Sequence, residues 1–231
     1  MRSLGLSTLA VLSLAGAASA QTMDLSFLGT SAGSSVSVTA PGHNGGTFAG
    51  QIRFNFANPQ GGTPSSFVGN QISFCIELPQ GVSRAARTYN YVPTTSPAFV
   101  TGNSTTDARR AAVAWLFERH GNQATSGNNT VAAAMQLAIW EIMNDWNPAT
   151  GRASLDLSSG NLTSTVSGAT LTQANAFLDS AIPGIGLPTG VAIWTNNNVQ
   201  DQITVVPTPG AGVIAAFALA GMVGRRRRPA L

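Results

Sequence analysis

Apolar and polar residues alternate along several short stretches of the chain, as they do in half-buried β-strands. The clearest stretch is residues 48–56, in which Ile52, Phe54 and Phe56 alternate with polar side chains. The same pattern predicts strands at residues 34–39, 71–78 and 88–92, and closing strands at residues 190–195 and 200–206. Glycine and proline between these stretches indicate turns.

Helical spacing of apolar residues dominates the middle of the chain. One predicted helix ends at Gly121, because glycine often follows the last turn of a helix. A second, residues 130–146, is apolar on nearly every side, so we expect it to be buried. A third, shorter helix covers residues 170–182. Strands, then helices, then strands predict an α+β fold, an antiparallel β-sandwich or barrel with a helical subdomain inserted at about residues 104–182.

The start of the chain has the three parts of a secretory signal peptide. Arg2 precedes an apolar run, which is followed by small residues that end at Ala20. Such a signal directs export, and we expect its cleavage between Ala20 and Gln21, which removes residues 1–20. The following segment, residues 21–206, is long enough for one domain with a hydrophobic core.

The end of the chain carries a second apolar run, residues 210–224, followed by four arginines. As a helix it would span about 22 Å, less than the roughly 30 Å of a bilayer core, so one interpretation is a marginal membrane anchor. The other follows from a resemblance. The motif Pro207, Thr208 and Pro209, the apolar run and the arginines resemble a PEP-CTERM sorting signal, although Thr208 replaces the usual glutamate. That resemblance implies transient anchoring and cleavage of residues 207–231 by an exosortase-like protease.

Charge and composition exclude several classes of function. The formal net charge of +3 comes from 12 basic and 9 acidic residues, and every basic residue is arginine. Five arginines lie in the two terminal segments, which leaves a net charge of about −2 between them and no basic patch for nucleic acid. With two histidines, one cysteine and no phosphate-binding loop, we expect neither a metal nor a cofactor.

The single cysteine, Cys75, lies in a predicted strand and excludes an internal disulfide. Because side chains alternate along a strand, Cys75 shares a face with Ser73 and Glu77, opposite the apolar face. A cysteine with only a packing role would more often lie among the apolar residues, so its position favours a function. Gln136 lies in the buried helix, where an unpaired amide costs about 1 to 3 kcal/mol. We therefore expect the Cys75 face of the strand to pack against this helix at Gln136.

A thiol held against a carboxamide can attack its carbonyl carbon and expel ammonia, which leaves a thioester between the two side chains. The reaction is slow for a free thiol with a pKa of about 8.5, so the fold must hold the groups in contact. Burial then protects the thioester from water.

Two short motifs resemble those of bacterial thioester domains on surface adhesins. Phe-Cys-Ile-Glu at residues 74–77 is similar to their Tyr-Cys-Ile-Asp motif, and Met-Gln-Leu-Ala-Ile-Trp at residues 135–140 is similar to Thr-Gln-x-Ala-Ile-Trp. The resemblance covers roughly residues 50–146. It implies that Cys75 supplies the thiol and Gln136 the acyl group, and that an amine or hydroxyl on a surface protein or polysaccharide becomes covalently attached. The protein would be consumed in this reaction, so we expect an adhesive cell-surface or extracellular-matrix protein and not an enzyme.

Three further residues are candidates for tuning the site. Met135 stands where the family has threonine, Glu77 stands where it has aspartate, and Glu141 follows Gln136 in the same helix. Two alternatives stay open. The protein is a structural component of the envelope or matrix in which the thioester is unreactive or absent, or it is a cysteine hydrolase that pairs Cys75 with His120. The hydrolase is the weaker alternative, because Cys75 lies within a strand and not at a helix N-terminus.

Overall fold

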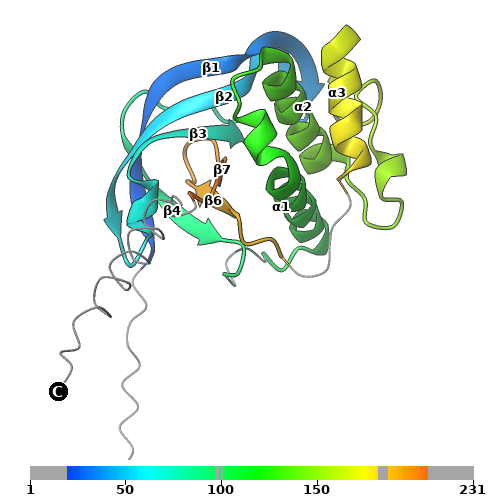
Figure 1. Cartoon of the computed structure of the whole chain (residues 1–231). Coiled ribbons are helices and arrows are strands. Elements are labelled where there is room, and N and C mark those ends of the chain that lie inside the picture. Colours follow the sequence, from blue (N-terminus) through cyan, green and yellow to red (C-terminus); the bar gives the residue numbers. More distant parts are fainter. Residues whose placement is uncertain (1–19, 97–98, 100, 182–186, 208–231) are drawn as a thin grey trace, which may run out of the picture.

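The computed structural model describes residues 20–96, 99, 101–181 and 187–207 (Figure 1). Residues 1–19 of the predicted signal peptide lie outside the described residues. So does the predicted sorting segment from Thr208 onward, which includes Pro209. Within the described residues, no helix is both long enough and apolar enough to cross a membrane.

Seven antiparallel strands of the described chain form one sheet that closes on itself. The strand order is β2-β3-β7-β6-β4-β1-β5, and β2 also pairs with β1. Thr22 of β1 is paired with Gln60 of β2 on one side and with Asn90 of β4 on the other, which closes a barrel. The strands are β1 (Thr22–Ala40), β2 (His43–Gln60), β3 (Gly69–Cys75), β4 (Arg87–Pro93), β5 (Thr163–Ser164), β6 (Val191–Thr195) and β7 (Gln202–Val205).

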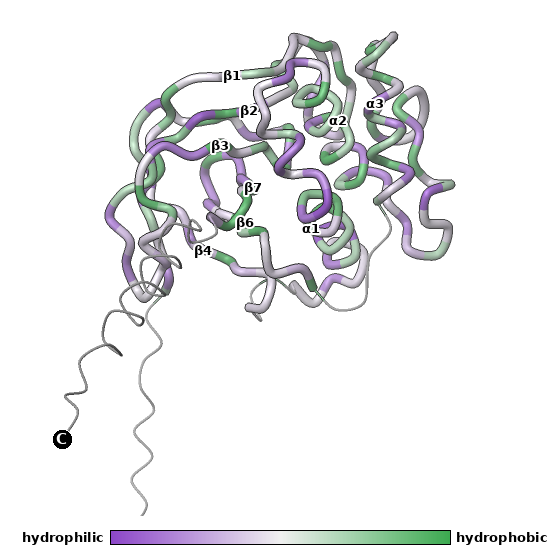
Figure 2. Tube along the Cα trace, in the orientation of Figure 1, coloured by the Kyte–Doolittle hydropathy of each residue, from purple (hydrophilic) through white to green (hydrophobic). Residues whose placement is uncertain are grey.

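The predicted α+β class with an inserted helical segment is confirmed. The helices α1 (Ser104–Ala124), α2 (Asn129–Asp145) and α3 (Gly168–Asp179) all lie between β4 and β6 in the chain. They stack beside the barrel, with α2 between α1 and α3 (Figure 1). Two short 3-10 helices, Ser65–Phe67 and Arg152–Ser154, complete the described elements. Figure 2 shows hydrophilic and hydrophobic segments alternating along β2 and β3.

The first two strands are much longer than the pattern predicts, with 19 residues in β1 and 18 in β2. Irregularities in their register interrupt the alternation of β1 before residue 34, which is why the sequence pattern missed that half. Gly33 and Gly50 pair where the two backbones lie close together, and a Cβ added to Gly33 would lie 2.4 Å from the Ala49 oxygen. The resulting ribbon bends from the barrel to α2 (Figure 1).

The expected end of α1 at Gly121 is wrong, because the helix continues to Ala124. The glycine is required there by packing: a Cβ on Gly121 would lie 2.8 Å from Cγ2 of Val205 in β7. At the other end, the Asn103 side chain accepts hydrogen bonds from two amides of the first turn and caps the helix.

Aromatic side chains fill the barrel. The Phe56 and Trp194 rings meet edge to face at 5.0 Å, and the Phe54 ring approaches Tyr89 at 6.5 Å. All four residues are almost wholly buried, and each such side chain contributes about 1.5 to 3 kcal/mol of hydrophobic stabilisation. Helix α2 is buried continuously from residue 132 to residue 142, as its composition predicts.

Candidate functional site

Cys75 lies at a point where the sheet has an open edge inside the molecule. It is the last residue of β3, and the ladder between β2 and β3 ends two residues earlier, at the pair Ile52 and Ser73. On the opposite side β3 still pairs with β7, and the Ile76 N–H donates to the Asp201 oxygen at 3.0 Å. Because successive residues direct their N–H and C=O groups to opposite sides, those of Cys75 point toward β2, where no strand residue meets them.

Gln136 takes the place of the missing strand. Its Oε1 accepts a hydrogen bond from the Cys75 N–H at 2.9 Å, and its Nε2 donates to the Cys75 oxygen at 2.7 Å. The Gln136 side chain is 1 % exposed, so these two bonds satisfy a carboxamide and two main-chain groups that water does not reach. The structure thus brings the two residues of the sequence hypothesis into direct contact, through the main chain of Cys75.

The thiol of Cys75 is held by two further glutamines. Its S–H donates to Oε1 of Gln200 at 2.7 Å, and Nε2 of Gln202 lies 3.7 Å from the sulfur. Both carboxamides are fixed in orientation: Gln200 Nε2 donates to the Glu77 oxygen, and Gln202 Oε1 accepts from the Ser73 hydroxyl at 2.8 Å. Three carboxamides therefore surround one cysteine.

Gln200 and Gln202 were not among the site residues predicted from the sequence. The available signal was their spacing, since two glutamines two residues apart in a predicted strand of β-branched residues lie on one face. Gln202 is wholly buried and pairs directly with Cys75 across the sheet. A buried polar stripe of this kind needs polar partners, but the pattern alone does not say which ones.

Burial raises the pKa of the Cys75 thiol to about 12, and the negative charge of Glu77 adds to this, whereas the hydrogen bond from Gln202 opposes it. The thiol is therefore neutral at physiological pH. A high thiol pKa makes the thiolate a poor leaving group, so a thioester formed on this sulfur would resist loss of its thiol. The same burial that slows formation of the bond would thus preserve it.

The alternation of side chains along β3 is confirmed, but the expectation that its Cys75 face packs against α2 is wrong, because Gln136 meets the main chain at the edge of the strand. Phe74 points outward to the helices, where its ring meets that of Phe117 at 5.5 Å. Ser73 pairs with Ile52 and points with Cys75 into the barrel interior, next to Tyr89, whose hydroxyl donates to the Gln200 oxygen at 3.4 Å. Both faces are buried, so the Cys75 face is a polar patch within the core.

The three predicted tuning residues have different surroundings. Glu77 lies just past β3, supplies its main-chain oxygen to Gln200, and accepts a hydrogen bond from the Asp201 amide at 3.3 Å. Met135 is wholly buried in α2. Glu141 instead accepts from the Asp156 amide at 2.6 Å, a contact outside the set of groups that surround Cys75.

His120 contacts α3. Its Nε2 lies 2.8 Å from the Ser180 hydroxyl, and its ring lies 5.1 Å from that of Phe177. Since α1 continues beyond Gly121, His120 is not at the helix C-terminus as expected, and burial together with the charge of Arg119 lowers its pKa. These contacts give the hydrolase alternative no geometric support.

Residues at the predicted processing sites adjoin the barrel where they are described. The Gln21 oxygen accepts a hydrogen bond from the Tyr91 amide at 2.8 Å, and Gln21 Nε2 donates to the Gly62 oxygen at 3.3 Å. Ala20 is exposed and Pro207 is half-buried. The predicted cleavage position therefore lies directly at the start of the barrel.

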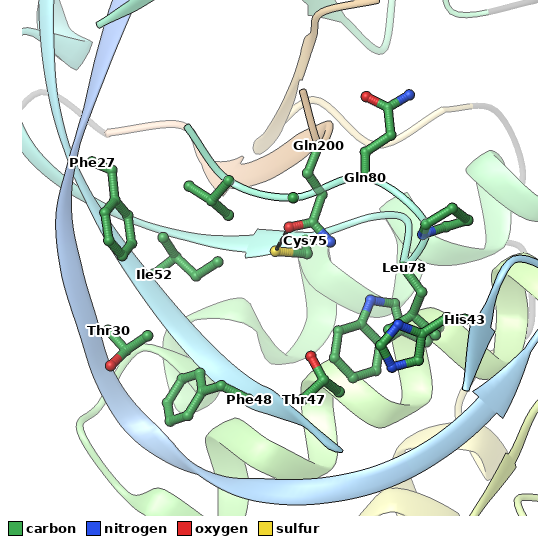
Figure 3. A pocket seen from close by; sticks show the side chains of 14 residues that line it. Phe27, Thr30, His43, Thr47, Phe48, Ile52, Cys75, Leu78, Gln80 and Gln200 are labelled. Carbon is green, nitrogen blue, oxygen red and sulfur yellow. Dashed lines mark hydrogen bonds between the residues drawn. The ribbon is translucent and has the colours of Figure 1, made fainter. Parts of the chain in front are cut away.

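A pocket of about 380 Å³ opens beside the cysteine (Figure 3). Cys75 and Gln200 line one side, and Phe27, Thr30 and Phe48 of the β1 and β2 ribbon line another. The remaining lining residues are His43, Thr47, Ile52, Leu78, Pro79, Gln80, Gly81, Val82 and Trp140. Pro79 is exposed and Cys75 is buried, so the pocket joins the surface to the thiol.

Comparison of the chain with protein-family models, with curated proteins and with solved structures gave no match. The geometry around Cys75 and the two motifs that contribute Cys75 and Gln136 are therefore the observations that bear on function.

Proposed function

We propose that this is an exported surface protein that forms a thioester between Cys75 and Gln136 and uses it to capture a nucleophile on a surface or matrix partner. The observation that carries the proposal is the pair of hydrogen bonds between the Gln136 carboxamide and the main chain of Cys75, at 2.9 and 2.7 Å. Contact between these residues is what the two motifs imply for a thioester domain, although the motifs lie 61 residues apart in the chain.

The hydrogen bonds also suit the chemistry. As the sulfur attacks the Gln136 carbonyl carbon, negative charge develops on Oε1, where the Cys75 N–H already donates. The C–S bond forms, the C–N bond breaks, and the thiol proton leaves with the nitrogen as ammonia. The sulfur must first turn from Gln200 toward Gln136, which requires a change of the Cys75 side-chain rotamer.

In capture the Cys75 sulfur, which was the nucleophile, becomes the leaving group. An amine or hydroxyl attacks the Gln136 carbonyl, its proton passes to the sulfur, and the product is an amide or ester with a free Cys75 thiol. A covalent link of this kind exceeds the ceiling of non-covalent affinity, about −18 to −21 kcal/mol, and so resists dilution and shear. An exposed surface is where such a link is useful, which agrees with the predicted export and sorting signals.

A structural envelope or matrix protein is the second candidate. The observation that favours it is that Gln136 completes the inner edge of β3 without any reaction, because both of its polar atoms are already paired. In that case the glutamine is a structural replacement for a strand, and Cys75 is a buried thiol.

Intact mass of the freshly purified protein separates the two candidates. A thioester lowers the mass by one ammonia, and Cys75→Ala and Gln136→Ala should each restore the calculated mass. Gln51→Ala is a matched control, because Gln51 is equally buried and hydrogen-bonded, at 2.7 Å to the Ala124 oxygen, but has no contact with the cysteine. It should keep the deficit. A deficit that disappears in Gln200→Ala but persists in Gln136→Ala would assign the acyl group to Gln200 and contradict the proposal.

Methylamine then tests reactivity. It should add the mass of one methylamine to the thioester form, at Gln136, and should release one thiol that titrates after denaturation. A full calculated mass before any treatment would favour the structural candidate.

A further inference from the structure

We propose that the pocket beside Cys75, here called the acceptor pocket, binds a neutral hydroxyl-bearing group such as a sugar unit of a polysaccharide, and that one of its hydroxyls is the nucleophile. The acceptor pocket is the cavity of about 380 Å³ that contains Cys75, Gln200 and Trp140 in its lining. The inference rests on the proposed thioester function and names the class of molecule that is captured.

Three residues that line this pocket each carry a buried polar atom without a hydrogen-bond partner among the described residues. These atoms are Nε1 of Trp140, Nε2 of His43 and Oε1 of Gln80. Trp140 is 1 % exposed, so its N–H is a donor that the fold itself leaves unpaired. Buried polar groups are nearly always paired, and the unpaired groups of Trp140 and His43, which come from separate segments, indicate a ligand that pairs them. A hydroxyl fits because it accepts from the Trp140 N–H and donates to Nε2 of His43. Gln80 contributes less, because its carboxamide points away from Cys75 in Figure 3 and it also lines a second pocket.

The charge of the pocket argues against a lysine-like acceptor. None of its described lining residues is Asp, Glu, Lys or Arg. A primary ammonium that enters would lose water without gaining a counter-charge, which is costly, whereas a hydroxyl carries no charge to compensate. The rings of Phe27 and Phe48 add apolar walls, which suit the C–H faces of a sugar.

The position of the pocket suits the reaction. Trp140 follows Gln136 by four residues in α2, so the two side chains lie on the same face of the helix. In Figure 3 the labelled Phe27, Thr30 and Phe48 lie across the pocket from Gln80, and Cys75 lies between them. A hydroxyl bound there attacks the Gln136 carbonyl, the C–O bond forms as the C–S bond breaks, and the hydroxyl proton passes to the sulfur.

A comparison of two probes tests the inference, and it uses the thioester form of the protein, whose mass is lower by one ammonia. Methyl glucoside and N-acetyl-lysine are compared by the rate at which each adds its mass to Gln136. We expect the glucoside rate to saturate with concentration and the lysine rate to rise linearly. Trp140→Phe keeps an aromatic ring but removes the N–H, and should lower the ratio of glucoside to lysine rates by roughly 2- to 12-fold, the worth of one hydrogen bond.

Trp146→Phe is the matched control, because Trp146 also has a buried, unpaired Nε1 but does not line the pocket. It should leave the rate ratio unchanged. Saturation by N-acetyl-lysine with no saturation by the glucoside would overturn the inference, and so would an equal loss of ratio in both tryptophan variants. Failure of the thioester proposal is a different result, since no ammonia deficit would then be present at the outset.

Discussion

Helix α2 buries two polar side chains five residues apart, Gln136 and Glu141, and the fold treats them in opposite ways. Gln136 has both polar atoms paired with the Cys75 main chain. Glu141 has one oxygen paired with the Asp156 amide, and its Oε2 has no partner among the described residues. A neutral carboxamide offers the donor and the acceptor that an open strand edge needs. A carboxylate offers only acceptors, so burial raises the Glu141 pKa to about 8 and the acid keeps its proton at neutral pH.

Removing the Gln136 side chain should have the largest effect on stability. Gln136→Ala leaves the Cys75 N–H and C=O unpaired and opens a cavity, so we expect a loss of about 3 to 5 kcal/mol in the free energy of unfolding, together with loss of the ammonia deficit. Urea denaturation measures the first and intact mass the second.

The same substitution in the Cys75→Ala background separates the two contributions. That background forms no thioester, so any remaining loss belongs to the hydrogen bonds and the cavity. A double variant as stable as Cys75→Ala alone would show that the Gln136 hydrogen bonds contribute nothing to stability.

Replacing Glu141 should have the next largest effect, which grows as the pH rises from about 4.5 to about 8. Its pKa is raised from 4.5 to about 8, so its contribution to stability is full below pH 4.5 and is lost as the pH rises through 8. Glu141→Gln removes this loss, and we expect the variant to exceed the parent protein by a few kcal/mol at pH 9. Urea denaturation from pH 4 to pH 9 measures the difference.

Asp179→Asn is the control for this titration. Asp179 forms a surface ion pair with Arg152 at 2.7 Å, which is worth about 0 to 1 kcal/mol, so its removal should leave the pH slope unchanged. Equal slopes for Glu141→Gln and the parent protein would mean that the folded protein ionises Glu141 at its ordinary pKa.

The rate at which the Cys75 thiol is alkylated supplies a third test. In Gln136→Ala the thiol is free, and because its pKa is raised to about 12, only a small thiolate fraction reacts with iodoacetamide. The alkylation rate should increase about tenfold for each pH unit from 7 to 10. A plateau near pH 9 would show an ordinary cysteine, and would remove the argument that burial protects the thioester.

That Cys75 and Gln136 meet was predictable from the two motifs, but the manner of contact was not: Gln136 reaches the main chain at the edge of β3, and the Cys75 side chain points into the barrel. The rest of the site was not predictable. Gln200 and Gln202 reach the thiol only because β7 pairs with β3, a contact between residues more than 120 positions apart. A glycine at position 121 suggests a helix end, but its small size is instead explained by packing against Val205 of β7. A contact with a residue so distant in sequence leaves no local pattern.

The sequence suggested both Glu77 and Glu141 as tuning residues. They differ in their effect on the pKa of the Cys75 thiol. The charge of Glu77 raises the Cys75 pKa, whereas Glu141 is no part of that shift. In the Gln136→Ala background, Glu77→Gln should therefore speed alkylation at pH 8 by about two- to threefold, which corresponds to a Coulomb energy of about 0.4 to 0.7 kcal/mol. Glu141→Gln should leave the rate unchanged, because a protonated acid carries no charge to remove. Equal acceleration by both substitutions would mean that Glu141 is ionised and that its charge raises the pKa of the Cys75 thiol.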